Sequence, residues 1–331
     1  MTEAAQAAAA RASELCDAAL AGDRLALARL LTAVENRTPV AESALRRLYP
    51  LAGGAHLVGI TGPPGSGKST LVSALIATAR AAGRAVGVIA VDPSSPITGG
   101  ALLGDRVRMQ AYAADSDVFI RSMASRGHAG GLASTSAAAA AVLDAAGFDL
   151  ILLETVGTGQ SEVEVAASAD TTVVLEAPEM GDEVQAIKAG LLEVADIVVV
   201  NKGDRPGAQR TAAQLRAMLT ASARVGQGIV DKPRPKQPQV LVTTALSGDG
   251  VPELLAAIDG LRGTATASTA ARATRAEAQV WAILADRLRA ELSKPGLRAA
   301  AAATLAQVAA HELDPFTAAD RLLEEIARAR N

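Results

Sequence analysis

Residues 62–70, GPPGSGKST, constrain the fold more than any other feature of this sequence. They match the pattern G-x4-G-K-[ST], with a short apolar run before them and a helical sequence after them. Glycines let backbone N–H groups turn inward around phosphates, and the start of the following helix favours negative charge. Chance is a poor explanation for a match in this strand–helix context. We therefore predict a nucleotide triphosphatase fold.

The motif also assigns roles to its side chains. Lys68 is expected to bridge the terminal phosphates, and the Ser69 hydroxyl is expected to ligate Mg²⁺. The residues predicted to surround the phosphates are consecutive: Gly65, Ser66, Gly67, Lys68, Ser69 and Thr70.

Short β-branched runs alternate with Ala-rich helical stretches between about residues 55 and 262. Their hydrophobicity is continuous rather than alternating, which is typical of strands that are buried on both faces. The runs cover residues 56–61, 85–91, 117–120, 149–154, 171–176, 196–201 and 239–244. With helices between them, they predict an α/β fold of the P-loop NTPase type, in which helices flank a mostly parallel sheet.

The two ends of the chain have a helical sequence pattern, unlike the alternating pattern of the middle. Residues 1–54 have helical spacing interrupted at Pro39 and Pro50, and they predict two or three short helices. Residues 263–331 contain no strand-like run and predict two or three helices cut near Pro295 and Pro315. We therefore divide the chain into an N-terminal helical region, a middle nucleotide-binding domain (55–262) and a C-terminal helical region.

A guanine-reading motif, N-K-x-D, ends one of the later apolar runs. The Asp204 carboxylate can accept from both N1–H and the exocyclic amine of guanine, and adenine lacks this donor pattern. The aliphatic stem of Lys202 would lie along the base plane, while Asn201 would brace the loop. An ordinary Asn/Asp turn is the alternative. The exit of the next run offers a second base contact through a backbone N–H, at Thr244, Ala245 and Leu246.

Magnesium needs further oxygen ligands beside Ser69. Asp92 and Glu154 each follow an apolar run, and ligands gather at the carboxyl ends of parallel strands. Asp105, in a Gly-rich stretch, is a third candidate. The alternatives are a turn residue for Asp92 and a helix cap for Asp105.

The segment Glu154-Thr-Val-Gly157 resembles the D-x-x-G that senses the γ-phosphate, with Glu in place of Asp. The N–H of Gly157 can still face that phosphate. Thr158 stands where many GTPases carry a water-orienting Gln. We therefore expect slow intrinsic hydrolysis, with the missing group supplied by another segment or another protein.

Composition excludes several classes of function. A net charge of -3, a pI near 5.8 and 2% aromatic residues argue against a nucleic-acid partner. No stretch reads as membrane-spanning, and the N-terminus lacks the pattern of a targeting peptide, so we expect a cytoplasmic protein without a membrane partner. One cysteine and three scattered histidines give no spacing for a multi-Cys metal cluster.

Six segments together resemble the MeaB/ArgK-type GTPases, a family that includes the methylmalonic aciduria type A protein. These segments are GPPGSGKST (62–70), VDPSSPITGGALLGDRVRM (91–109), SMASRGHAGGLA (122–133), ETVGTGQSEVEVA (154–166), APEMGDEVQAIKAGLLEVADIVVVNKGD (177–204) and TTALSGDGV (243–251). The resemblance implies a GTPase that forms a homodimer through a helical C-terminal arm. It also implies service to an adenosylcobalamin-dependent acyl-CoA mutase, as a chaperone that gates cofactor delivery and protects or reactivates the mutase.

The resemblance also implies residue roles. Segment 178–188 matches a mobile loop that responds to the mutase, in which Gln185 and Lys188 are candidates for completing the active site. A plain solvated helix face is the alternative for these two residues. The residues that match the family's nucleotide–magnesium set are Lys68, Ser69, Asp92, Asp105 and Glu154.

Several alternatives stay open at this point. Members that serve the methylmalonyl enzyme often read GVPGVGKS and SPTSGTLGG where this chain has GPPGSGKS and SMASRGHAGG, so 2-hydroxyisobutyryl or isobutyryl mutases are also possible clients. A nucleotide-binding regulatory module with negligible turnover is one alternative function. A nickel-type metallochaperone GTPase is another, although it usually needs a Cys/His site. Transport-coupled ATP hydrolysis conflicts with Asn201 and Asp204, which favour guanine.

Overall fold

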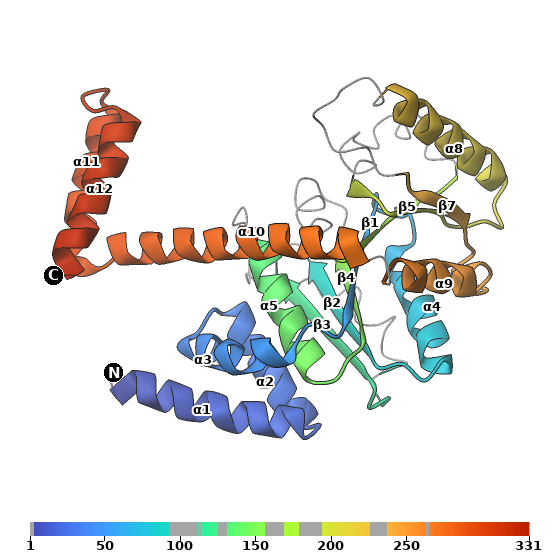
Figure 1. Cartoon of the computed structure of the whole chain (residues 1–331), viewed down its shortest axis with the longest axis horizontal. Coiled ribbons are helices and arrows are strands. Elements are labelled where there is room, and N and C mark those ends of the chain that lie inside the picture. Colours follow the sequence, from blue (N-terminus) through green and yellow to red (C-terminus); the bar gives the residue numbers. More distant parts are fainter. Residues whose placement is uncertain are drawn as a thin grey trace. The chain divides into compact units, whose positions relative to one another are not determined.

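The computed structural model describes residues 3–92, 112, 114–124, 131–155, 169–178, 194–225, 237–262 and 265–330 (Figure 1). The chain forms two compact units, Met1–Arg275 and Ala276–Asn331. Helix α10 (Ala265–Leu292) begins in the first unit and ends in the second. The sheet and the N-terminal helices belong to the first unit. Our division of the chain at residues 54 and 262 stays a prediction.

A seven-stranded sheet forms the centre of the first unit (Figure 1). Its strand order is β3-β2-β4-β1-β5-β6-β7. Every pair of neighbouring strands is parallel. The strands are β1 (His56–Thr61), β2 (Val86–Asp92), β3 (Val118–Ala124), β4 (Leu150–Thr155), β5 (Thr171–Glu176), β6 (Ile197–Val200) and β7 (Gln239–Val242). Each of the seven predicted runs is therefore a strand, and the predicted α/β fold is confirmed.

Helices cover both faces of the sheet because successive strand side chains point to opposite faces. On β5, Val173 and Leu175 pack in one apolar cluster with helices α4 (Lys68–Ala81) and α9 (Val251–Arg262). Val174 lies between them in sequence and packs on the other face, with α8 (Ala208–Val225). Helix α5 (Gly131–Ala145) packs on this second face as well, over β2 and β4.

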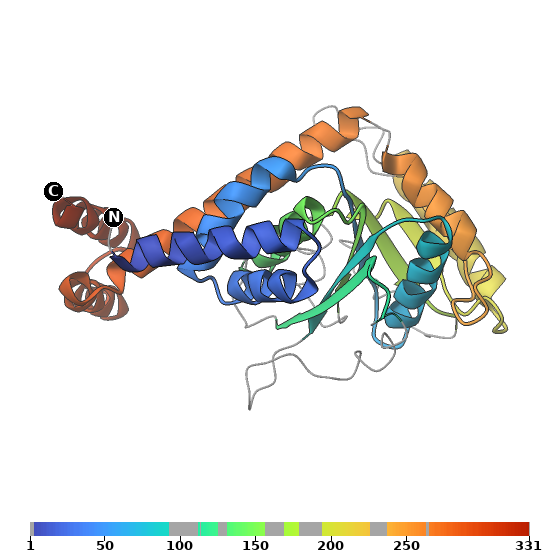
Figure 2. The same ribbon diagram turned by 90° about the horizontal axis from the view of Figure 1, so that it is seen from below.

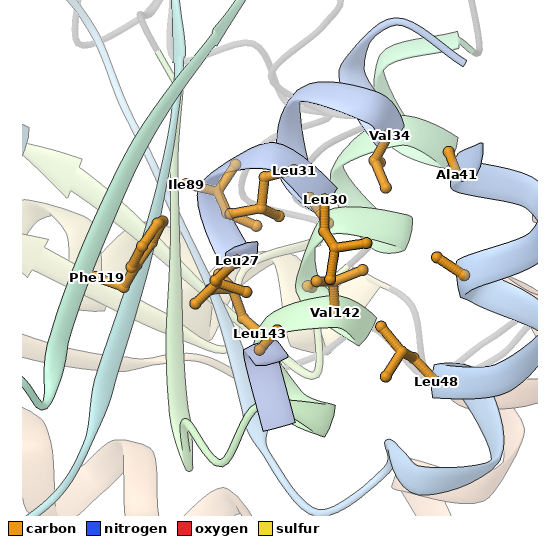
Figure 3. Packing of buried hydrophobic residues seen from close by; sticks show 14 of the residues in the cluster. Leu27, Leu30, Leu31, Val34, Ala41, Leu48, Ile89, Phe119, Val142 and Leu143 are labelled. Carbon is orange, nitrogen blue, oxygen red and sulfur yellow. The ribbon is translucent and has the colours of Figure 1, made fainter. Parts of the chain in front are cut away.

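The N-terminal region forms three helices, α1 (Glu3–Leu20), α2 (Arg24–Glu35) and α3 (Pro39–Leu48), which confirms the predicted short helices. Helix α2 begins where the Asp23 carboxylate accepts the N–H groups of Leu25 and Ala26, at 2.7 and 3.1 Å. One side of α2 is apolar, and Figure 3 shows its Leu30 beside Val142 of α5. Burial of this side joins the helices to the sheet unit.

Two arginine contacts fasten α2 to the edge strand β3. Arg24 donates to the carbonyl oxygens of Asp115, Ser116 and Val118 at 3.1, 2.9 and 2.8 Å. The Arg121 guanidinium of β3 lies 2.6 Å from the Glu35 carboxylate at the end of α2. In Figure 2, which views the ribbon from below, α1, α2 and α3 lie together. The N-terminal helices are therefore joined to the sheet by polar as well as apolar contacts.

The second unit holds the rest of α10 and two further helices, α11 (Pro295–Ala309) and α12 (Pro315–Arg330), which pack against each other. The predicted breaks near Pro295 and Pro315 are confirmed. Several large apolar side chains of this unit are exposed: Val280, Trp281, Ile283, Leu284, Leu305, Phe316 and Leu323. Among the described helices of the whole chain, none is both long enough and apolar enough to cross a membrane.

Candidate nucleotide-binding site

The phosphate loop follows β1 and has a backbone that only glycine tolerates at two positions. Gly62 has φ 142°, and a Cβ atom there would lie 2.3 Å from the carbonyl oxygen of Leu175 in β5. Gly67 has φ 95°, and its Cβ would lie 2.4 Å from Nδ2 of Asn201. Both φ values lie where L-residues are disfavoured, and both contacts leave no room for a side chain. The loop is therefore packed closely against the ends of β5 and β6.

Lys68 is the first residue of α4, and its side chain turns back over the phosphate loop. Its ammonium group donates to the carbonyl oxygens of Gly62 at 2.7 Å and Pro63 at 3.1 Å. The residue is buried. The carbonyls of the loop thus hold the Lys68 ammonium group beside the residues that the sequence predicts to bind phosphates.

Two of the four predicted magnesium ligands lie in contact. The Ser69 hydroxyl at the start of α4 donates to Oε1 of Glu154 at 2.6 Å. Glu154 is buried near the end of β4, beside the end of β1. A hydroxyl and a carboxylate are ligands that suit a hard divalent cation, so this pair fits Mg²⁺.

The other two predicted magnesium ligands, Asp92 and Asp105, lie partly or wholly outside the described part of the chain. Asp92 ends β2, which pairs with β4 so that both strands end at the same edge of the sheet, but its side chain lies outside the described part of the chain. Asp105 lies entirely outside it. Among the residues that the structure describes, no three His, Cys, Asp or Glu side chains gather as a metal-binding group.

Asn201 joins the predicted base loop to the phosphate loop. Its Nδ2 donates to the carbonyl oxygen of Ser66 at 2.9 Å. Its Oδ1 accepts from the Thr243 hydroxyl at 3.2 Å and from the N–H of Ala245 at 3.1 Å. Asn201 is 2% exposed, so these bonds form away from water. One side chain thus connects the loops that follow β1, β6 and β7.

Lys202 makes a second connection to the phosphate loop. It has φ 57°, and its ammonium group donates to the carbonyl oxygen of Gly65 at 2.7 Å. The next residue, Gly203, donates its N–H to Thr243 at 2.8 Å, and a Cβ there would meet Val242 at 2.8 Å. Asp204 follows and is exposed. The carboxylate predicted to read guanine is thus open to solvent beside the joined loops.

The predicted second base contact lies next to Asn201. The N–H of Ala245 is the one that Asn201 accepts, and the N–H of Thr244 donates to Asp249 at 2.9 Å. The side chain of Leu246 is 88% exposed. The structure therefore brings this segment to the base loop and leaves an apolar side chain open beside it.

Four predicted site residues lie outside the described part of the chain, and their roles stay predictions: Asp105, Gly157, Gln185 and Lys188.

Sequence reasoning missed Glu176, the last residue of β5. It is 2% exposed, and burial raises its pKa to about 7. Within the described structure, its Oε1 has no hydrogen-bond partner. The signal was available, since Glu176 ends the apolar run TTVVLE just as Glu154 ends an earlier run. Two strands at this edge therefore carry a buried glutamate at or next to their last residue.

The geometry joins a phosphate loop to a guanine-type loop, and comparison with known proteins identifies the family. Residues 27–296 match the family model described as "Methylmalonyl Co-A mutase-associated GTPase MeaB". The chain belongs to the MeaB family. This MeaB-family protein is a GTPase with a P-loop fold that binds GTP and GDP.

Individual relatives agree with the family match. A putative GTPase of Pyrococcus horikoshii is 46% identical over 320 residues, with 95% of this chain and 98% of the relative covered. The mouse protein named "Methylmalonic aciduria type A homolog, mitochondrial" is 33% identical, with 92% and 76% covered. A crystal structure titled "LAO/AO transport system kinase" superposes with a TM-score of 0.66 at 30% identity, covering 99% of both chains.

Proposed function

We propose that this MeaB-family GTPase hydrolyses GTP at residues 65–70 and uses the nucleotide cycle to serve an adenosylcobalamin-dependent acyl-CoA mutase. One observation carries the placement of the nucleotide. The guanine-type loop is bonded directly to the phosphate loop, through Asn201 to Ser66 and through Lys202 to Gly65. A base held by the first loop would therefore leave its phosphates at the second.

The proposed chemistry is mainly positioning and charge stabilisation, as is general for phosphoryl transfer. Lys68 would exchange its carbonyl partners, Gly62 and Pro63, for phosphate oxygens and stabilise the charge that develops there. Backbone N–H groups of the loop and of the start of α4 would donate to the same oxygens. The N–H of Gly157 would face the γ-phosphate.

Ser69 and Glu154, with Asp92 and Asp105, would hold Mg²⁺. When bound, the ion neutralises negative charge on the phosphates. The hydrogen bond between Ser69 and Glu154 holds the hydroxyl and the carboxylate together beside the phosphate loop.

The mutase half of the proposal is supported by the family description and by the name of the mouse relative. In this proposal the GTPase is a chaperone that gates cofactor delivery and protects or reactivates the mutase. Gln185 and Lys188 would complete the active site when the mutase is bound, so turnover without the mutase would be slow. The methylmalonyl, 2-hydroxyisobutyryl and isobutyryl enzymes are the clients to test.

We also propose a homodimer formed through the C-terminal unit. Its exposed apolar side chains on α10, Val280, Trp281 and Leu284 among them, would be covered in the dimer. Sedimentation of the full chain and of its Trp281→Glu variant tests this. A dimer that Trp281→Glu dissociates supports the proposal, and a monomeric wild-type chain refutes it.

Steady-state GTP hydrolysis, measured alone and with each mutase, tests the proposed function. Lys68→Ala provides the blank. We expect a slow basal rate that one mutase raises by about tenfold or more, since it would supply the missing catalytic contacts. A basal rate that no mutase changes contradicts the partner assignment. Equal turnover in wild type and Lys68→Ala contradicts the site.

A further inference from the structure

Glu176 lies between the two loops that we propose to hold the nucleotide. Its backbone oxygen accepts the N–H of Asn201 at 2.8 Å, which ties it to the guanine-type loop. The carbonyl of the preceding residue, Leu175, packs on Gly62 at the start of the phosphate loop. The end of β5 is therefore in contact with both loops.

The carboxyl group of Glu176 points to an apolar side of the sheet. Side chains alternate along β5, so Glu176 shares the face of Val174, which belongs to the apolar cluster below α8. Its register partner on β6 is Val200, a fully buried member of the same cluster. A carboxylate in these surroundings has little to stabilise its charge.

No described basic side chain compensates the carboxyl group. Lys68 donates to carbonyls of the phosphate loop, Lys202 donates to Gly65, and Asp204 is exposed on the neighbouring loop. On α8, Arg216 donates to the carbonyl of Val240 in β7. Burial is accordingly what raises the pKa of Glu176 to about 7. Both charge states of the group are therefore populated near neutral pH.

We propose that nucleotide binding is linked to protonation of Glu176, so that the protein with a protonated Glu176 carboxyl binds GTP and GDP more tightly than the ionised form. The proposal rests on the placement of the nucleotide at residues 65–70. Phosphates bring negative charge to a loop that Glu176 adjoins, which disfavours a second negative charge there. Linkage is reciprocal, so protonation of the carboxyl must strengthen nucleotide binding by the same factor.

The size of the effect follows from Coulomb's law. Two unit charges roughly 10 Å apart, at an effective dielectric constant of about 20, change a binding constant by about tenfold. GTP carries one more phosphate than GDP. Its affinity is therefore expected to depend more steeply on pH than that of GDP.

Titration calorimetry tests the proposal, with GDP and a non-hydrolysable GTP analogue in excess Mg²⁺, from about pH 6 to about pH 8.5. Glu176→Gln removes the titrating group and keeps its size. Glu253→Gln is the matched control, because Glu253 is an exposed glutamate in the first turn of α9. Wild type and Glu253→Gln are expected to lose about tenfold more affinity than Glu176→Gln across this range.

Equal pH slopes in wild type and Glu176→Gln would overturn the linkage. If Glu176→Gln does not fold, the wild-type protein alone decides: its binding enthalpy at neutral pH must vary between buffers of different ionisation enthalpy, with proton uptake. An enthalpy that is independent of the buffer refutes the proposal. Lys68→Ala distinguishes failure of the linkage from failure of the proposed nucleotide site. Nucleotide binding that survives this change contradicts the site itself.

Discussion

Replacement of Asn201 by alanine tests the junction between the base loop and the phosphate loop. The change removes the three hydrogen bonds to Ser66, Thr243 and Ala245. It leaves a carbonyl, a hydroxyl and an N–H without their partner in a buried site. The loops that follow β1, β6 and β7 would then lack their common connection.

The size of the loss can be worked out from these contacts. Each hydrogen bond has a net value of about 1 kcal/mol, so three of them predict a loss of about 3 kcal/mol in the free energy of unfolding. Affinity for GDP should fall as well, because the base loop would no longer hold one position relative to the phosphate loop.

Urea unfolding and GDP titration measure the two effects, and Asn201→Asp is the informative companion. Aspartate keeps an acceptor for Thr243 and Ala245 but loses the donor to Ser66. Aspartate also buries a charge and sets an acceptor against the Ser66 carbonyl, so we expect its stability to fall at least as far as that of Asn201→Ala, with GDP affinity reduced in both variants. A loss below about 1 kcal/mol with unchanged GDP affinity in Asn201→Ala would refute the reasoning.

Three further predictions follow from backbone strain and from the pKa values of buried groups. Gly67→Ala adds a Cβ 2.4 Å from Asn201 at a φ of 95°, and should cost roughly 2 kcal/mol and most of the nucleotide affinity; a wild-type urea midpoint would contradict this. Burial raises the pKa of Glu176 from 4.5 to about 7, so ionisation should lower the free energy of unfolding by up to about 3 kcal/mol as pH rises through that window. Urea midpoints of Glu176→Gln should lack this decline, and parallel curves would exclude it. Burial also lowers the pKa of His56 below its usual 6.5; the charge of Asp170 raises this pKa and that of Arg262 lowers it further. The stability that neutral His56 supports should therefore be present above pH 6.5 and lost as the pH falls. His56→Gln should flatten the acid side of the stability curve, and an unaltered acid limb would count against it.

The strands were predictable because parallel strands buried on both faces read as continuous apolar runs. The phosphate loop and the guanine-type motif were predictable because their chemistry restricts residue types at fixed spacing. The bond between Asn201 and Ser66 was not, since 135 residues separate the two positions and only the strand order brings them together. Nor does sequence show that Lys202 adopts a positive φ, because a local motif does not encode the loops packed around it.

Glu176 illustrates a different limit. The sequence shows an acid at the end of an apolar run, as it does for Glu154, but only the structure distinguishes their surroundings. Glu154 meets the Ser69 hydroxyl, whereas Glu176 faces the apolar cluster with Val200. The N-terminal helices show the same limit, because periodicity predicts which side of α2 is buried and not that α5 and β3 cover it.

The contact of Arg24 with β3 has a consequence for any shortened form of the protein. An edge strand offers unpaired backbone groups to other chains, and the Arg24 guanidinium occupies three of the carbonyls at the start of this edge. The leucines of α2 cover apolar side chains of α5 at the same time. A chain that begins at β1 would therefore expose both the unpaired backbone groups of the sheet edge and the apolar side chains of α5. It should self-associate rather than yield a smaller active GTPase.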